Sequence, residues 1–266
     1  MTRIAAIQMV SAPEVAPNLT AAGRLIDAAA AAGAKLVALP EYFCILGRHE
    51  TDKVKARERE GSGPIQDFLA DAARRNHVWI VGGTVPLATG NQDKVRSACL
   101  VFDATGRRVA RYDKMHLFWL SLGEQKFDES RTIEPGEAPV TLETPFGRLG
   151  LSVCYDVRFP EFYRAAGTVD AWLVPSAFTA TTGAAHWDTL LRARAIENQC
   201  YVIAPAQGGA HPNGRRTHGH SMIVDPWGEV LACREQGEGV VLAELDPARV
   251  AEVRQSLPAL GHRKMR

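Results

Sequence analysis

The sequence predicts an α/β protein, and three observations indicate this fold class and a single domain. Strand-like apolar runs alternate with helix-like runs along the whole 266-residue chain. With 46% hydrophobic residues the chain can bury a large core, and this length is ordinary for one α/β domain. No linker rich in Pro, Gly or Ser and no internal repeat interrupts the series. We therefore expect residues 1–266 to form one domain.

The first elements follow from short apolar runs and the residues that end them. Residues 4–10 (IAAIQMV) predict a strand. Residues 18–32 predict an Ala-rich helix, because Gly33 is a favoured residue just beyond a helix end. Residues 35–39 (KLVAL) predict a second strand, which stops because Pro40 cannot donate a hydrogen bond to a sheet.

The middle of the chain predicts a helix, a strand and a hairpin. The helix is expected over 64–76, since the proline at its start suits a first helical turn. An apolar run predicts a strand over 78–85. The segments 98–103 and 107–112 flank a short turn (ATG) and predict a hairpin.

The second half of the chain continues the alternation. Residues 148–154 (RLGLSVC) predict a buried strand, which a short helix follows up to Arg164. The remaining elements are expected in this order: strand 171–175, helix 184–198, strand 200–205, a hairpin of 221–224 and 229–233, strand 240–245 and helix 247–257.

Cys154 ends one of these strands and precedes an abrupt turn into a helix. In α/β sheets, ligands meet the carboxyl ends of strands, so this thiol is placed as a nucleophile would be. The N–H groups of Tyr155 and Asp156, near the start of the helix, can receive developing negative charge. A lone cysteine is nonetheless more often a small buried apolar residue, so Cys154 needs support from other segments.

Two other segments supply that support. Glu41 follows Pro40 at the tip of a predicted strand, and Lys114 follows the alternating run 108–113. Either residue alone is weak evidence, because loop carboxylates and surface lysines are common. Together, a carboxylate, an ammonium and a thiol, each at or near the end of a strand-like run, form a convincing constellation of reactive groups.

With these residues the chain resembles the carbon–nitrogen hydrolase (nitrilase) superfamily, whose signature is a Glu–Lys–Cys triad. The resemblance covers nearly the whole chain and is closest to the deaminated glutathione amidase branch, sister to the omega-amidases. It rests on GAAHW at 183–187, RARAIENQCY at 192–201 and GHSMIVDPWG at 219–228. It implies an α-β-β-α sandwich, commonly paired into a layered dimer. The family carries a second glutamate after its lysine, which Glu129 matches and Glu124 does not.

The resemblance and the chemistry together give each residue an expected role. Cys154 attacks the carboxamide carbon, and Glu41, in a site closed enough to raise its pKa, is the general base. Lys114, with the Tyr155 N–H, stabilises the oxyanion. Glu129 orients Lys114 or the substrate amide.

Substrate contacts and rival groups are predicted from position only. Tyr42, Phe43, Phe178 and Thr182 are expected to line the pocket. Arg158 and Arg194 are candidate cations for a substrate carboxylate, although we favour structural ion pairs for both. The rival groups are His116 as a spare base, Cys44 as a second thiol, and His218 with His220 as a metal pair that no neighbouring motif completes. Residues 119–126 depart from the family pattern and put the pocket shape in doubt.

Composition excludes several classes of partner. Thirty-one basic and thirty acidic side chains give a net charge of +1, which recommends neither nucleic acid nor an anionic membrane. The apolar run at the amino terminus is too short for a secretion signal. Five cysteines without paired spacing fit a reducing compartment, so we expect a cytoplasmic protein with no metal and no cofactor. The chain ends soon after residue 263 without the tail of filament-forming nitrilases, and we expect a homodimer or another closed oligomer.

Three hypotheses of function remain at this point. The leading one is an amidase acting on a small carboxamide of the deaminated glutathione type. The alternative within catalysis is an omega-amidase acting on a shorter 2-oxo acid amide such as 2-oxoglutaramate, and a nitrilase is less favoured. A binding or scaffold module is the hypothesis from another class, which the three retained triad residues argue against.

Overall fold

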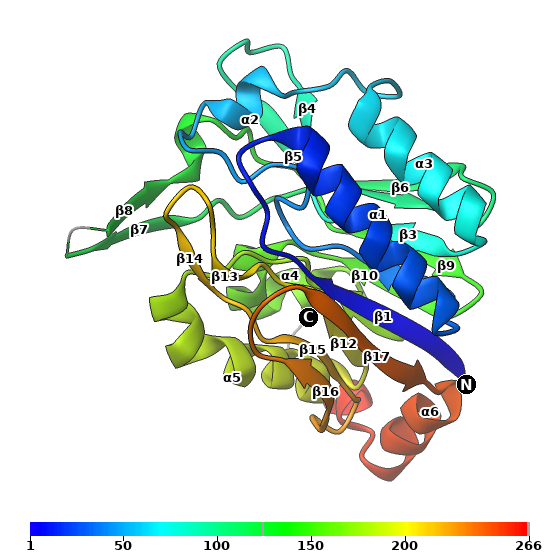
Figure 1. The fold of residues 1–266 in the computed structure, drawn as a ribbon. Helices are drawn as coiled ribbons and strands as arrows, with labels where there is room; N and C mark the ends of the chain where they lie inside the picture. Colours follow the sequence, from blue (N-terminus) through cyan, green and yellow to red (C-terminus); the bar gives the residue numbers. More distant parts are fainter. Residues whose placement is uncertain (124, 265–266) are drawn as a thin grey trace.

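The computed structural model describes residues 1–123 and 125–264, in which two sheets pack face to face between helices (Figure 1). The first sheet has seven strands, and β6 joins the path at β5. Its order is β17 (Gly239–Leu245), β1 (Thr2–Gln8), β2 (Leu36–Ala38), β3 (Trp79–Val81), β5 (Val95–Phe102) and β4 (Val85–Ala88), with β6 (Arg108–Asp113) beside β5.

The second sheet has six strands. Its order is β16 (Val230–Arg234), β15 (Ser221–Val224), β12 (Tyr201–Ala204), β11 (Ala171–Leu173), β10 (Gly147–Leu151) and β9 (Val140–Thr144). Each sheet has a parallel centre, formed by β1, β2 and β3 in the first sheet and by β10, β11 and β12 in the second. Loops that leave the carboxyl ends of these parallel strands are where α/β proteins place their ligands.

Helices cover the outer face of each sheet. On the first sheet, α1 (Val15–Ala31) and α3 (Pro64–Asn76) lie side by side (Figure 1). On the second sheet lie α4 (Pro160–Ala165) and α5 (Ala180–Asn198). The chain also forms α2 (Asp52–Lys55), α6 (Pro247–Ser256) and the short 3₁₀ turns η1 (Glu129–Arg131), η2 (Cys154–Arg158) and η3 (Ala259–His262). The layers form the α-β-β-α sandwich that the family resemblance implies.

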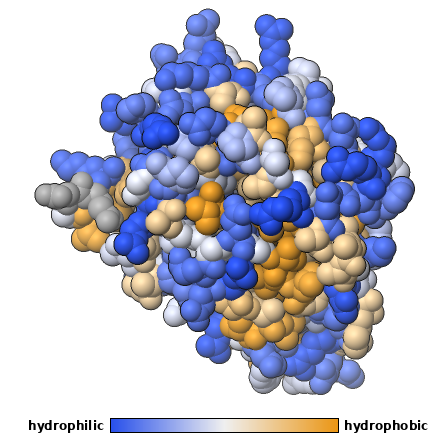
Figure 2. Space-filling view, in the orientation of Figure 1, coloured by the Kyte–Doolittle hydropathy of each residue, from blue (hydrophilic) through white to orange (hydrophobic). Residues whose placement is uncertain are grey.

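Strand β1 is buried on both faces, which explains why its apolar run is continuous. Ile4 and Ala6 belong to the core between the two sheets, whereas Ala5 and Ile7 belong to the core under α1 and α3. A strand covered on both faces needs apolar residues at every position, so alternation of polar and apolar residues is lost. In Figure 2, polar residues surround an apolar area in the lower part of the molecule.

Most predicted elements are confirmed to within a few residues, and one prediction is wrong. The expected strand 78–85 is two strands, β3 and β4, because the chain turns at Gly82 and Gly83 between them. Gly83 has φ 52°, and a Cβ there would lie 2.1 Å from the Pro40 carbonyl oxygen. The sequence analysis missed α2, β9 and two hairpins, β7 (Trp119–Leu122) with β8 (Gln125–Asp128) and β13 (Gly208–Ala210) with β14 (Arg216–His218). Among the helices of the described part of the chain, none is long and apolar enough to cross a membrane.

Candidate active site

Glu41, Lys114, Glu129 and Cys154 come together between the two sheets. Lys114 Nζ lies 2.8 Å from Glu41 Oε1 and 2.7 Å from Glu129 Oε2. Cys154 and Glu41 line the same cavity, and the charge of Glu41 acts on the pKa of the Cys154 thiol. The side chains are shielded from solvent, with Lys114 0% and Glu41 1% exposed. An ammonium and two carboxylates are thus in direct contact inside the protein, and a thiol shares their cavity.

The loop after β2 positions Glu41. The Phe43 N–H donates to the Pro40 carbonyl oxygen at 3.2 Å, which tightens the turn. The side-chain amide of Gln207 donates to the Glu41 carbonyl oxygen at 3.0 Å. Tyr42 has φ 57°, a left-handed conformation that a non-glycine residue keeps only when its surroundings hold it.

Cys154 stands at the junction of β10 and η2. Its N–H donates to the Pro175 carbonyl oxygen at 2.9 Å, and its φ is 48°. Cys154 lines a cavity together with Glu41 and Glu129. The Asp156 N–H, expected to face developing charge, donates instead to the Val153 carbonyl oxygen at 3.1 Å. The Tyr155 N–H donates to no acceptor within residues 1–123 and 125–264.

The two carboxylates beside Lys114 receive different numbers of hydrogen bonds. Glu129 accepts from Lys114, from the Tyr42 hydroxyl at 2.7 Å and from the Phe118 N–H at 2.7 Å. The Glu41 carboxylate accepts from Lys114 at 2.8 Å. Glu129 is therefore the better-stabilised anion of the two.

The pKa values follow from burial and from these contacts. Burial raises the pKa of Glu41, and Lys114 offsets this only in part. Burial acts the same way on Glu129, but Lys114 and the hydrogen bonds hold its pKa below the ordinary value. For Lys114, burial favours a lower pKa, but Glu129 and Glu41 outweigh it and the pKa is raised. Burial and then Glu41 raise the pKa of Cys154, so the resting sulfur is a thiol that needs a base.

A cavity of about 430 Å³ opens onto this cluster. Of the predicted lining residues, Tyr42, Arg158, Phe178 and Thr182 do line it, as do Glu41, Glu129, Cys154 and Tyr155. The prediction for Phe43 is wrong: its side chain is fully buried in the core beneath α1 and α3. Sequence reasoning missed several lining residues: Phe118, Phe127, Asp128, Thr179, Arg215 and Thr217. They come from the two hairpins that it also missed and from the start of α5.

The two candidate arginines differ in their surroundings. Arg194 is buried, donates to the Val157 carbonyl oxygen at 2.8 Å and pairs with Glu197, so it is a structural residue as expected. Arg158 lies in the cavity wall 5.2 Å from the Phe178 ring centroid, and its guanidinium contacts His186. No ion pair of Arg158 occurs within residues 1–123 and 125–264, so the favoured structural ion pair is absent from that part of the chain.

The rival groups have other contacts. His116 Nδ1 lies 2.7 Å from Asp156 Oδ1, and the Cys44 sulfur lies 3.4 Å from the Thr84 carbonyl oxygen in the core. Burial raises the pKa of Cys44. The rings of His218 and His220 stack with centroids 4.1 Å apart, and the described residues contain no cluster of three potential metal ligands. Glu124 lies outside the described residues, and the atypical segment around it forms the β7–β8 hairpin, which projects from the body in Figure 1.

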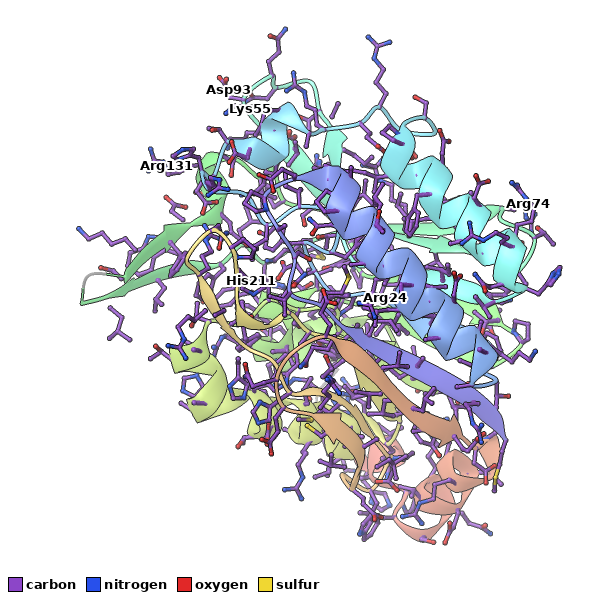
Figure 3. All side chains as sticks on the ribbon, in the orientation of Figure 1. Arg24, Lys55, Arg74, Asp93, Arg131 and His211 are labelled. Carbon is purple, nitrogen blue, oxygen red and sulfur yellow. The ribbon has the colours of Figure 1, made fainter. Side chains whose placement is uncertain are left out.

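One histidine outside these predictions supports the wall of the site. His211, labelled in Figure 3, follows β13 and is buried. Its Nδ1 lies 3.0 Å from the Ser11 carbonyl oxygen and its Nε2 lies 2.8 Å from Thr217 Oγ1. Burial lowers its pKa, so this imidazole joins the β13–β14 hairpin to the loop after β1 in its neutral form.

Known proteins resemble this chain over nearly its full length. The family model described as carbon-nitrogen hydrolase matches residues 3–255. The deaminated glutathione amidase of Synechocystis sp. is 45% identical over 265 residues, which are 97% of each chain. The human protein of the same name is 38% identical over 273 residues, covering 98% of this chain and 82% of its own.

Solved structures agree with the sequence relatives. The Caenorhabditis elegans NitFhit protein matches with a TM-score of 0.89 and 38% identity, covering 99% of this chain and 65% of the longer one. Nit3 of Saccharomyces cerevisiae, described as a nitrilase-superfamily member, matches with a TM-score of 0.87 and 31% identity over 99% of this chain and 97% of its own. The fold, the site and these matches lead to one conclusion: the chain belongs to the carbon–nitrogen hydrolase family.

Proposed function

We propose that this protein hydrolyses a small carboxamide to a carboxylate and ammonia through a thioester on Cys154. The observation that carries the proposal is that Glu41 and Cys154 line one cavity beside a lysine held between two carboxylates. The cluster opens onto a cavity large enough for a small molecule. The similarity to deaminated glutathione amidases supports an amide of that type as substrate.

The first half of the reaction forms the thioester. Glu41 takes the thiol proton as the Cys154 sulfur attacks the carboxamide carbon, and negative charge develops on the carbonyl oxygen. The Lys114 ammonium and the Tyr155 N–H stabilise that oxygen. Glu41 then gives its proton to the amide nitrogen, the carbon–nitrogen bond breaks and ammonia leaves.

The second half hydrolyses the thioester. Glu41, again ionised, takes a proton from a water molecule that attacks the thioester carbon. The same two donors stabilise the second oxyanion. The carbon–sulfur bond breaks, and the sulfur of Cys154 recovers the proton from Glu41. The product acid leaves and gives its remaining proton to solvent, which makes it a carboxylate.

The difference between the two carboxylates assigns the base. A base needs a pKa raised toward the working pH, and Glu41 has the raised value. Glu129, with more donors and a lowered pKa, stays charged and orients Lys114. If Glu129 also took up protons, Lys114 would lose the charge that supports it in a buried site.

Trapping the intermediate tests this function. Glu41→Gln keeps the shape of the side chain but cannot activate water, so we expect a slowly loaded acyl group to persist on Cys154. Intact mass spectrometry of the variant mixed with a panel of small amides, followed by peptide mapping, measures the adduct. The wild type, which releases its acyl group, is the matched control. An adduct on Cys44, or none with an amide that the wild type hydrolyses, contradicts the mechanism.

A second prediction concerns the Tyr42 hydroxyl, which donates to Glu129 at 2.7 Å. Tyr42→Phe removes a hydrogen-bond donor that stabilises the Glu41–Glu129 pair when both carboxylates are ionised. The pair should therefore take up its first proton at a higher pH. Since both carboxylates must be ionised for turnover, we expect the acid limb of the kcat/KM profile to shift upward in pH. The profile of the wild type, measured with the same amide, is the reference. Superimposable acid limbs would mean that Glu41 and Glu129 do not titrate as a coupled pair.

Turnover comparisons decide the substrate within this class. Deaminated glutathione and 2-oxoglutaramate, measured side by side, separate the leading hypothesis from an omega-amidase, and a nitrile tests the nitrilase hypothesis. Arg158, in the cavity wall, is the cation we assign to a substrate carboxylate. We further propose a single domain over residues 1–266, a cytoplasmic location and a closed homo-oligomer. Normal binding of an amide that is never hydrolysed would favour a binding module instead.

A further inference from the structure

A buried carboxylate outside the cavity joins the two segments that carry Cys154 and Lys114. Asp156 is fully buried. Its Oδ2 accepts from the Val153 N–H at 2.8 Å and from the Tyr112 hydroxyl at 2.6 Å. Its Oδ1 accepts from the His116 N–H at 3.1 Å, and His116 Nδ1 lies 2.7 Å away. One side chain therefore holds the residue before the nucleophile and the residues two positions before and two positions after the lysine.

We call these bonds of Asp156 to Val153, Tyr112 and His116 the Asp156 clamp, and other contacts extend it. The Tyr112 hydroxyl, which donates to Asp156, accepts from the Met115 N–H at 3.1 Å. The His116 ring stacks on Phe159, with centroids 3.8 Å apart and an angle of 11° between the planes. Strand β6 ends at Asp113, so Lys114 has already left the regular sheet ladder. Its position relative to the thiol depends on these bonds as well as on its own backbone.

We propose that Asp156 is a positioning residue, which keeps the Cys154 turn and the Lys114 segment in register so that sulfur and ammonium act on the same carbonyl group. This inference rests on the proposed hydrolysis. Cys154 keeps φ 48°, a conformation that persists only where the surrounding structure holds it, and the Val153–Asp156 bond is part of that hold. A displacement of about 1 Å between reacting groups costs on the order of 100-fold in rate.

The direct variant is Asp156→Asn, in which an amide group replaces one acceptor oxygen. That NH₂ cannot accept the hydrogen bonds on its side of the clamp. We expect kcat to fall about 100-fold. KM should change little, because Asp156 does not line the described cavity. Activity is referred to the folded fraction, measured by circular dichroism.

A pair of matched variants separates positioning from packing. Tyr112→Phe removes only the hydroxyl that links Asp156 to Met115, and we expect kcat to fall about tenfold. Tyr163→Phe is the control: this buried tyrosine of the same core donates to Ser152 Oγ at 2.9 Å and has no hydrogen bond to Asp156 among the described residues. It should lose stability without losing kcat. If Asp156→Asn does not fold, the difference in kcat between Tyr112→Phe and Tyr163→Phe tests the positioning role of Asp156.

A second readout needs no amide substrate. N-ethylmaleimide alkylates cysteines, and the exposed Cys233 serves as the internal standard in the same molecule. We expect Cys154 to react at least about tenfold more slowly relative to Cys233 in Asp156→Asn and Tyr112→Phe, because Glu41 no longer takes the thiol proton efficiently. A wild type that hydrolyses no amide refutes the proposed function, while the alkylation ratio still tests the clamp. The inference is overturned if Tyr112→Phe keeps both the wild-type kcat and the wild-type ratio of Cys154 to Cys233 alkylation. It is also overturned if Tyr163→Phe loses as much kcat as Tyr112→Phe.

Discussion

Cys154→Ala abolishes carboxamide hydrolysis while the protein stays folded. We expect turnover to fall at least about 10⁴-fold, because no thioester can form and water must then attack the amide directly. Alanine keeps the Cβ and the backbone at φ 48°, so packing changes only by the loss of one sulfur atom. Ammonia release measures activity, and thermal unfolding confirms that the inactive variant is native.

Cys44→Ala is the matched control for this result. Cys44 is also buried and lies three residues after Glu41, but its sulfur contacts the Thr84 carbonyl oxygen and does not line the main cavity. Removing it leaves a small void, which should cost about 1 kcal/mol of stability. Turnover should stay at the wild-type level. Loss of activity in Cys44→Ala, with activity retained in Cys154→Ala, would show that the nucleophile is Cys44 and not Cys154.

The parts of the site at strand ends could be predicted from the sequence. Pro40 ends the strand before Glu41, and the turn sequence after Cys154 ends the other, so both side chains fall at the carboxyl edge of parallel strands. The alternating run 108–113 places Lys114 at the end of a further strand, and the family resemblance gives the lysine its role. These predictions depend on local signals, which a single sequence contains.

The remaining contacts could not be predicted, because they join residues far apart in the chain. The Tyr42–Glu129 bond spans 87 residues and the His116–Asp156 bond spans 40. Periodicity describes one element at a time and contains no information on such pairs. The error at Phe43 has a local cause. The left-handed turn at Tyr42 changes the direction of the chain, so its neighbour turns into the core rather than toward the cavity.

Lys114→Met should lower both activity and stability, and the loss of stability should depend on pH. Methionine keeps most of the length of lysine but removes the charge that Glu41 and Glu129 share in a fully buried site. Leaving buried charges unpaired costs about 3–5 kcal/mol at neutral pH. Loss of an oxyanion donor lowers kcat by about 10²–10³-fold. Amide turnover and urea unfolding at several pH values measure the two effects.

The direction of the pH effect follows from the carboxylate that loses its partner. Without Lys114, burial and the neighbouring carboxylate raise one folded-state pKa above the unfolded value of about 4.3. Stability from a raised carboxyl pKa is present below the unfolded pKa and is lost as pH rises through the folded pKa. The deficit of the variant should therefore shrink toward pH 5 and grow toward pH 8.

Two controls isolate the buried charge as the cause. Lys55→Met removes an exposed lysine that pairs with Asp52 at 3.0 Å and points outward in Figure 3, and it should change stability by less than about 1 kcal/mol at any pH. Lys114→Met combined with Glu129→Gln removes one of the two repelling carboxylates, so it should regain stability at pH 8 and stay inactive. A pH-independent deficit in Lys114→Met would mean that lost packing, rather than unpaired charge, destabilises the variant. In that case Lys114 would not be what keeps the two carboxylates ionised side by side.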